Sequence, residues 1–532
     1  MDPRVGGFSS THLPMAPQVA KVRDLSRFGI LPTDMANLRA SISVGGLEVA
    51  RYDIEIERLQ KELNRLTSER HALASYAEVC RSALSPVHRM PNELLAYIFK
   101  WCFPHKLYSI SLQTGTPAEE VDRICHRHLL ELSRVCFRWH NAAMETPQLW
   151  SEMAVDMRVW DRCDIPVANL LRMLESSLDR GQQHPLTLDV YAVDPHQHSF
   201  FKLLSKHVQR WQTAILWGDD GNNGLRTSAG NLLQLKKLNI IGNWKDVEIF
   251  RAAPLLQEVT FIGGVDNLPK LPWPQIQRFT YKDFFANVSL SARLSLLHLL
   301  TSATSAKLSL DLNPSSIVPL GVSITSNLRY IQFELATTAG STVAACQFLR
   351  NLTFPCLKSF GLFPRRYKNP PIWNSSQFIS LATRSGFDSC LTHLVIHAIV
   401  TDDELLRCLE VLPKLLLLSI TDCTSPGATQ TVITNTLLTQ LQCMSDARCL
   451  LVPDLQSLTL NTVLEFTDSV YLDLVLSRAG SEGELTFIAN LWWLEARRRD
   501  VAAEVLEEIT KLTTRGAFIF NRGEWNINTR LM

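Results

Sequence analysis

Several features are missing from this 532-residue sequence, and each absence excludes a class of protein. The first twenty residues contain no apolar run of signal-peptide length, and no segment approaches about 18 uninterrupted apolar residues. The twelve cysteines form no Cys-x-x-Cys pair, which favours reduced thiols over disulfides. We therefore expect a protein of the cytoplasm or nucleus with no membrane partner.

An excess of charge of one sign is also missing. The 53 Lys and Arg residues face 52 Asp and Glu residues, which leaves a formal net charge of +1. Without a global basic field, a nucleic-acid partner is not expected. With 46% apolar and 20% charged residues the composition is typical of a folded protein, and the length predicts about two to four domains.

The common catalytic signatures are missing too. The sequence has no Gly-x-Ser-x-Gly elbow, no phosphate-binding Gly-x-x-x-x-Gly-Lys-Ser/Thr loop and no His-Glu-x-x-His helix, so we expect no enzyme and no cofactor. Cys125, His128, Cys136 and His140 have a plausible spacing for a metal. Because zinc sites normally use tighter pairs mounted on turns, we interpret these residues as buried thiols and helix-face histidines and expect no metal.

The N-terminal part divides into a leader and a helix. Residues 1–45 mix Gly, Pro, Ser and Thr with little periodicity, which predicts a mobile leader. A heptad pattern runs from Val49 to Leu84 with only Arg70 off pattern, and it predicts a helix over residues 46–84. Two apolar positions per heptad suit self-association through residues 49–84, and the alternative is an amphipathic helix packed against its own protein.

Residues 85–150 are interpreted as three short helices. Pro91 suits the first position of a helix because its φ is fixed and its missing N–H costs nothing there. Thr116 and Glu119 have the form of a capping box, which predicts a second helix up to Leu132, and a third helix should end before Pro147. A bundle this small has only a marginal core and cannot bury all of its apolar side chains. Some of them should therefore face a partner.

The ordered motifs of this block resemble an F-box. They read Met90-Pro91-x-Glu93-Leu94-Leu95-x-x-Ile98-Phe99, then Leu132-Ser133-x-Val135-Cys136-x-x-Trp139, then Pro147-x-Leu149-Trp150. The preceding heptad helix, which ends in Ser85-Pro86, is similar to the arrangement in a large group of fungal F-box proteins. The chain departs from the family at Met90, where Leu is commoner, and in a longer stretch between the first two helices.

The resemblance implies docking to the small S-phase-kinase-associated adaptor, which links such chains to a cullin, a RING subunit and a ubiquitin-conjugating enzyme. It implies that the chain itself contributes no chemistry. The adaptor contacts that it implies are Pro91, Leu94, Leu95, Ile98, Phe99, Leu132, Val135, Cys136 and Trp139. The alternative is that these side chains only close a three-helix core.

One local phrase recurs after residue 186: apolar, two residues, apolar, one residue, apolar. The copies are Trp211-Ala214-Leu216, Leu235-Leu238-Ile240, Leu256-Val259-Phe261, Ile276-Phe279-Tyr281, Leu328-Ile331-Phe333, Leu357-Phe360-Leu362, Leu391-Leu394-Ile396, Leu415-Leu418-Ile420 and Leu455-Leu458-Leu460, with a weaker one at Ser305-Leu308-Leu310. The last two apolar positions alternate as in a strand, and the stretches between copies are helix-like. Residues 151–185 are interpreted as linker helices.

Residues 186–532 thus look like an irregular leucine-rich repeat solenoid, and the alternative is an ordinary α/β domain with Leu-rich strands. Residues 485–519 should be the last helix and strand, with a solvated Arg497–Arg499 run. Residues between the buried positions would line a concave face and bind a target protein. These candidates are Trp217, Lys237, Glu258, Arg278, Tyr330, Gln332, His393 and His397.

The complete hypothesis is an α/β chain with an N-terminal helix, a three-helix F-box at residues 85–150 and an irregular leucine-rich repeat solenoid. Such a chain would be the substrate-recognition subunit of a cullin–RING ubiquitin ligase, with an unknown protein as its target. The alternative is a scaffold or inhibitor that uses the F-box for assembly without ubiquitin transfer.

Overall fold

The computed structural model describes residues 23–25, 27, 29, 31–102, 126–192, 197–219, 225, 231–245, 247–283, 290–312, 323–337, 349–365, 370–425, 428–443, 451–479, 487–494, 499–514 and 518–524. The chain forms two compact units, Met1–Pro91 and Asn92–Met532. The capping box expected at Thr116 and Glu119 lies outside the described residues.

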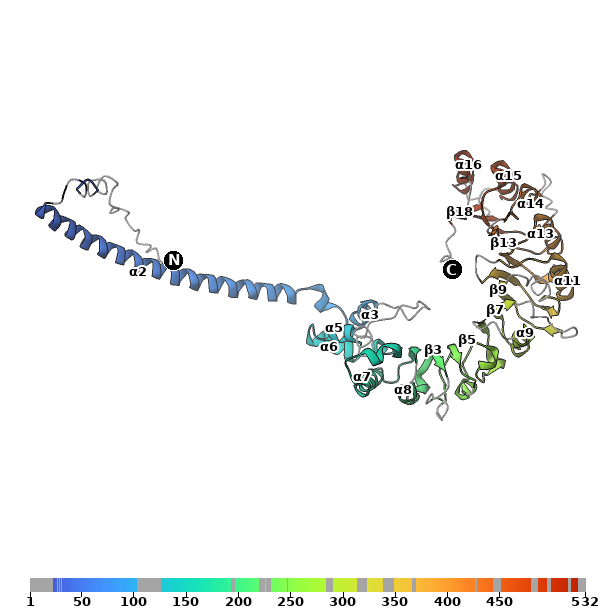
Figure 1. Ribbon diagram of the computed structural model, residues 1–532, viewed down its shortest axis with the longest axis horizontal. Helices are drawn as coiled ribbons and strands as arrows, with labels where there is room; N and C mark the ends of the chain where they lie inside the picture. Colours follow the sequence, from blue (N-terminus) through green and yellow to red (C-terminus); the bar gives the residue numbers. More distant parts are fainter. Residues whose placement is uncertain are drawn as a thin grey trace. The chain divides into compact units, whose positions relative to one another are not determined.

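The first unit is dominated by one long helix, α2 (Pro32–Ala83), which Figure 1 draws as continuous, followed by a short 3₁₀ turn, η1 (Pro86–Arg89). The helix begins at Pro32, so residues 32–45 are helical and do not belong to a mobile leader. Proline is well suited to this first position, and the apolar spacing continues upstream of Val49 through Ile42. The two glycines at 45 and 46 cost helix stability, which made the upstream helix hard to predict.

The second unit begins with a block of short helices: α3 (Asn92–Cys102), α5 (Arg127–Ser133), α6 (Phe137–Met144) and the 3₁₀ turn η2 (Pro147–Trp150). The first expected helix is present as α3. The third is present as α6 and ends before Pro147 as predicted, but it begins only at Phe137, so Val135 and Cys136 precede it. Phe99 packs on Trp139 with ring centroids 5.1 Å apart. The indole N–H of the buried Trp150 donates to the Ala143 carbonyl over 2.9 Å, which fixes η2 to α6.

A parallel sheet makes up most of the second unit, and the described residues contribute fourteen strands to it. In spatial order they are β1 (Glu152–Asp156), β2 (Leu186–Tyr191), β3 (Trp211–Asp219), β4 (Lys237–Asn243), β5 (Glu258–Ile262), β6 (Arg278–Lys282), β7 (Ser305–Leu312), β9 (Tyr330–Thr337), β11 (Ser359–Pro364), β12 (His393–Ile396), β13 (Leu417–Thr421), β16 (Ser457–Thr462), β17 (Phe487–Trp493) and β18 (Phe518–Glu524). Two short pairs, β8 (Ile324–Thr325) with β10 (Leu352–Thr353) and β14 (Cys423–Ser425) with β15 (Ala428–Gln430), lie outside it.

Helices follow most of these strands and cover one face of the sheet. They are α7 (Val167–Arg180), α8 (Gln197–Ser205), α9 (Leu290–Leu299), α11 (Ser375–Ser385), α12 (Phe387–Cys390), α13 (Asp402–Leu409), α14 (Asn435–Gln440), α15 (Asp468–Arg478) and α16 (Ala503–Thr514). Figure 1 shows the strands following one another along an arc with these helices on its outer side. Apolar side chains of strands and helices form one continuous core. We call the opposite side of the sheet, formed by the strand residues that alternate with the buried ones, the open face.

The register of the sheet tests the recurring phrase directly. Each of the nine full copies contains a strand, and their middle positions align, as where Phe360 pairs with Ile331 on one side and Leu394 on the other. The weaker copy was placed two residues too late, because Ala306 aligns with the middle positions of the neighbouring strands. Its residues are therefore Ala303-Ala306-Leu308, all buried. Two alanines at apolar positions made this copy hard to locate.

Three further expectations are wrong in detail. Residues 151–185 are not only helical linker, because β1 extends the sheet back to Glu152 and buries Met153 and Val155. The C-terminal segment contains a strand, a helix and a strand, β17, α16 and β18, in place of one helix and one strand. Arg499 is not a solvated helical residue: it precedes α16 and donates to the Leu464 carbonyl over 2.8 Å and to Asp468 over 2.6 Å.

The expectation of reduced thiols is also wrong at one position. Cys443, which follows α14, is disulfide-bonded, and its partner lies outside the described residues. The free cysteines among the described residues are Cys80, Cys102, Cys136, Cys163, Cys356, Cys390, Cys408 and Cys423. The spacing of cysteines along a sequence does not reveal which of them the fold brings together.

Candidate functional site

The helix α3 is apolar on two sides. Leu95 and Phe99 point into the block and are buried. The other side carries four large apolar side chains at the spacing i, i+3, i+4 and i+7, which places them on one helix face. They are Leu94, Tyr97, Ile98 and Trp101, with exposed fractions of 53%, 59%, 42% and 66%. We call these four residues the α3 patch.

The junction between α5 and α6 exposes two more apolar side chains. Val135 is 62% exposed and Phe137 is 80% exposed. Arg138 Nε donates to Asn92 Oδ1 over 3.1 Å, so the start of α6 lies beside the start of α3. This small block therefore presents apolar surface from two of its elements.

The structure gives the expected adaptor-binding residues different degrees of exposure. Leu94, Ile98 and Val135 are exposed, whereas Leu95 and Phe99 belong to the core and cannot form a docking surface without unfolding. Leu132, Cys136 and Trp139 are half-buried, and Pro91, although exposed, belongs to the other unit.

Three exposed side chains were missed by the sequence reasoning: Tyr97, Trp101 and Phe137. For the first two the signal was present, since they complete the helical spacing that Leu94 and Ile98 begin. Phe137 carried no such periodic signal.

Five of the eight expected target-binding residues lie in one row across the open face. Lys237, Glu258 and Arg278 are register partners on β4, β5 and β6, and Tyr330 and His393 continue the row on β9 and β12. Glu258 Oε2 lies 3.4 Å from Lys237 Nζ, and the same carboxylate is ion-paired with Arg278. The charges at this end of the row are therefore shared among neighbouring strands.

The other three candidates have different surroundings. Gln332 is half-buried one row further along the strands. Trp217 is half-buried against Tyr191, with ring centroids 5.5 Å apart. His397 is buried and packs on Phe363 at 4.9 Å, so the expectation that it contacts a target is wrong. His397 lies one residue beyond the end of β12, and strand alternation could not reveal that the ring of Phe363 packs on it.

Partial burial also changes the ionisation of His393. The loss of water around the imidazole lowers the pKa of His393, which favours its neutral form. The hydroxyl oxygen of Thr392 lies 2.8 Å from its Nδ1 and donates to the Lys358 carbonyl over 3.0 Å. His393 therefore presents a neutral hydrogen-bonding group.

The far end of the open face has a different chemistry. Asn490 Nδ2 donates to Thr459 Oγ1 over 3.0 Å, and Asn521 Nδ2 donates to Asn490 Oδ1 over 2.8 Å. Asn461 Nδ2 likewise donates to Thr421 Oγ1 over 2.8 Å. Amides and hydroxyls link neighbouring strands at this end of the sheet. Ion pairs do so at the other end, between β4, β5 and β6 and between β7 and β9.

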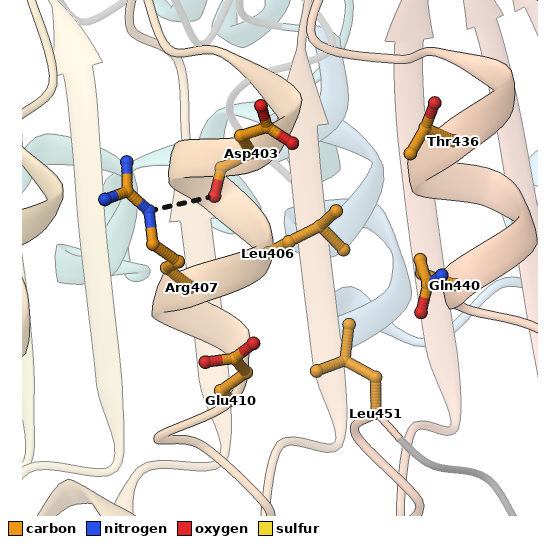
Figure 2. A pocket seen from close by; sticks show the side chains of 7 residues that line it. All are labelled: Asp403, Leu406, Arg407, Glu410, Thr436, Gln440 and Leu451. Carbon is orange, nitrogen blue, oxygen red and sulfur yellow. Dashed lines mark hydrogen bonds between the residues drawn. The ribbon is translucent and has the colours of Figure 1, made fainter.

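A pocket of about 550 Å³ lies on the helical side, between α13 and α14 (Figure 2). It is lined by Asp403, Leu406, Arg407, Glu410, Thr436, Gln440 and Leu451. Figure 2 shows Asp403 and Glu410 at opposite ends of α13, and Arg407 donates back to the Asp403 carbonyl over 3.3 Å. An active site requires charged groups that converge on one point. The charged groups that line this pocket do not converge.

The candidate metal ligands are not assembled either. Cys125 lies outside the described residues, and His128 and His140 are exposed. The described ranges contain no group of three or more His, Cys, Asp or Glu side chains that could hold a metal ion. They also contain no helix with the length and apolar character needed to cross a membrane.

No protein-family model matches the sequence, and no curated protein matches it. The two surfaces that remain as candidates, the α3 patch and the open face, are therefore interpreted from their own geometry.

Proposed function

We propose that the chain is an intracellular substrate receptor of a cullin–RING ubiquitin ligase. In this proposal residues 85–150 are an F-box whose α3 patch docks the S-phase-kinase-associated adaptor. The sheet and its helices are an irregular leucine-rich repeat solenoid whose open face holds a target protein. The observation that carries the proposal is that α3 is apolar on both sides.

The energetics favour a partner over a solvated patch. Fully burying one Leu, Ile or aromatic side chain gains about 1.5–3 kcal/mol, and α3 leaves four such side chains largely in water. Soluble proteins rarely keep large contiguous apolar surface without a binding role. Leu94 and Ile98 also belong to the motif that resembles an F-box, which supports the adaptor as the proposed partner.

The sheet supports the second half of the proposal. One parallel strand per recurring phrase, followed in most cases by a helix on the same side, is the arrangement that a leucine-rich repeat requires. The receptor would catalyse by proximity alone, because holding a target lysine near a charged conjugating enzyme raises its effective concentration.

The test is capture of the purified adaptor by the full chain. Leu94→Asp with Ile98→Asp should lower co-purification at least about tenfold, since two charges would face an apolar interface. Leu476→Asp is the matched control, because Leu476 is an equally exposed apolar residue on α15. Phe99 is unsuitable for this test because its ring is buried, so a substitution would destabilise the block itself.

Circular dichroism should show the same helix content and melting temperature for all three proteins. Undiminished capture by the double variant with its fold intact would reject the adaptor-docking role. Capture without accumulation of any target after proteasome inhibition would favour the scaffold alternative.

A further inference from the structure

Most strands from β4 onward have at their start two consecutive residues whose side chains are not part of the core. The recurring phrase causes this, because it leaves two positions between its first two buried side chains. We call these residues the amino edge of the sheet. From β4 to β16 they are Lys236, Lys237, Gln257, Glu258, Gln277, Arg278, Thr304, Ser305, Arg329, Tyr330, Lys358, Ser359, Thr392, His393, Leu416, Leu417, Gln456 and Ser457.

Charge at the amino edge is unbalanced. It holds five Lys and Arg residues and a single acid, Glu258. That acid already pairs with Lys237 and Arg278. Lys236, Arg329 and Lys358 are exposed and have no ion-pair partner in the part of the chain that the structure describes.

Two of these cations lie side by side. The backbone N–H of Lys358 donates to the Arg329 carbonyl over 2.7 Å, and that of Ser359 donates to the same carbonyl over 3.0 Å. Like charges on neighbouring strands repel each other and cost stability. Tyr330, which follows Arg329, is 46% exposed. A pair of cations without an ion-pair partner, beside the exposed Tyr330 and the half-buried Ser359, is a surface suited to an anion.

The surrounding sequence does not supply that anion. Residues 284–387 contain nine Lys and Arg residues and two acids, Asp311 and Glu334, in a chain whose net charge is only +1. Glu334 is occupied by Lys307, whose Nζ lies 2.7 Å from its carboxylate. This local excess of positive charge, which whole-chain composition conceals, is a signal that was available in the sequence.

We infer that Arg329 and Lys358 bind an acidic segment of a protein target, which would lie in an extended form along the amino edge. This inference rests on the proposed receptor function, since it specifies the chemical class of the target. The guanidinium of Arg329 would hold a carboxylate or phosphate through paired hydrogen bonds, and the ammonium of Lys358 would add a second positive charge. The hydroxyl groups of Tyr330 and Ser359 would complete the contact.

A nucleic acid fits this surface less well than a peptide. Specific binding to a phosphate backbone uses about 6–10 cationic contacts. The amino edge offers three unpaired cations among its described residues. Three contacts suit a short acidic peptide.

The experiment measures fluorescence anisotropy of labelled peptides of about 12 residues with the full-length chain. The probes are a Glu-rich peptide, the same peptide with phosphoserine in place of some Glu residues, and a Lys-rich peptide. Both acidic peptides should bind at about 50 mM NaCl and weaken at about 500 mM NaCl, while the Lys-rich peptide should not bind. A preference between the two acidic peptides would identify the natural form of the anion.

Charge reversal at the site provides the decisive comparison. Arg329→Glu with Lys358→Glu should weaken binding of the acidic peptides at least about tenfold. The matched control is Lys206→Glu with Lys270→Glu, which changes the net charge equally at two exposed lysines that pair with Glu175 and Glu248 elsewhere in the unit. The control should bind like the unmodified chain.

Three results would overturn the inference: no binding of either acidic peptide, equal losses in the site and control variants, or tighter binding of a single-stranded RNA of similar length. The adaptor test distinguishes this failure from failure of the proposed function. Arg329→Glu with Lys358→Glu should still capture the adaptor. If the unmodified chain binds acidic peptides but not the adaptor, the receptor role fails and the anion site remains.

Discussion

The strands of the sheet and the helix α3 use apolar residues in opposite ways. On β11 the apolar Phe360 is buried, while its neighbour Ser359 lies on the open face. On α3 the apolar Phe99 is buried too, but its neighbour Ile98 is also apolar and is exposed. The apolar residues of these strands are buried in the core of the sheet, whereas α3 carries more apolar side chains than the helical block buries. The long helix α2 also exposes large apolar side chains, but within the described part of the helical block that follows it, surplus apolar surface lies on α3 and around the start of α6.

The largest expected effect comes from the sheet core. Phe360→Ala should lower the free energy of unfolding by about 3–5 kcal/mol, because it leaves a cavity among closely packed rings. The ring of Phe360 lies 5.6 Å from Phe378 and 6.0 Å from Phe333 between centroids. Urea denaturation followed by circular dichroism measures this change. Ser359→Ala, one residue away on the open face, is the control and should stay within about 0.5 kcal/mol.

The same adjacent-residue comparison can be made on α3. Phe99→Ala should cost about 3 kcal/mol, because the ring is buried against Trp139, whereas Ile98→Ala should change stability by less than about 0.5 kcal/mol. Thermal denaturation of the full chain, with hydrogen exchange to resolve the helical block, reports both values. A comparable loss from Ile98→Ala would mean that the α3 patch is packed against the chain itself.

Asp189 on β2 is a buried acid of the open face, and its titration can be tested. Burial, together with the nearby carboxylate of Asp156, raises the pKa of Asp189 to about 7. The folded state then holds a proton that the unfolded state has released, so stability should fall as the pH rises from about 4 to about 7. Between pH 5 and pH 7 the loss should be about 2 kcal/mol.

Asp189→Asn should remove this pH dependence, which urea midpoints at pH 5 and pH 7 would detect. Burial also raises the pKa of Asp422 to about 6, so a smaller slope should persist below pH 6. An unchanged slope in Asp189→Asn would show that the carboxylate is hydrated.

The smallest expected effect concerns a helix end, where the local sequence is enough to predict the structure. In the capping box before α13, the Thr401 hydroxyl accepts from the Glu404 N–H over 3.3 Å and the Glu404 carboxylate accepts from the Thr401 N–H over 3.2 Å. Thr401→Ala should cost about 1 kcal/mol by thermal denaturation.

The control for this prediction is Thr383→Ala on α11. The exposed hydroxyl of Thr383 only donates back to its own helix, to the Ile379 carbonyl over 2.9 Å, so its removal should cost nothing. Equal costs at both positions would contradict the capping role.

Strand positions were the most predictable part of the fold. Pairs such as Leu238 with Ile240 alternate within a few residues, and such local alternation determines which side of a strand is buried. The helix α3 was predictable in extent for a similar reason, since it follows Pro91. Burial of His397 under Phe363 was not predictable, because Phe363 lies on β11 and His397 directly follows β12, and only the register of these two strands brings them together.

The sequence by itself determined the local periodicities: a long helix, a block of short helices and a series of strand–helix units in the C-terminal two thirds. Only the tertiary structure decided which apolar face of α3 is buried, that β1 extends the sheet, and that Arg329 and Lys358 stand together without an acid. The physical reason is range. Propensity and alternation act between residues a few positions apart, whereas burial and charge neighbours depend on strands brought together across many residues.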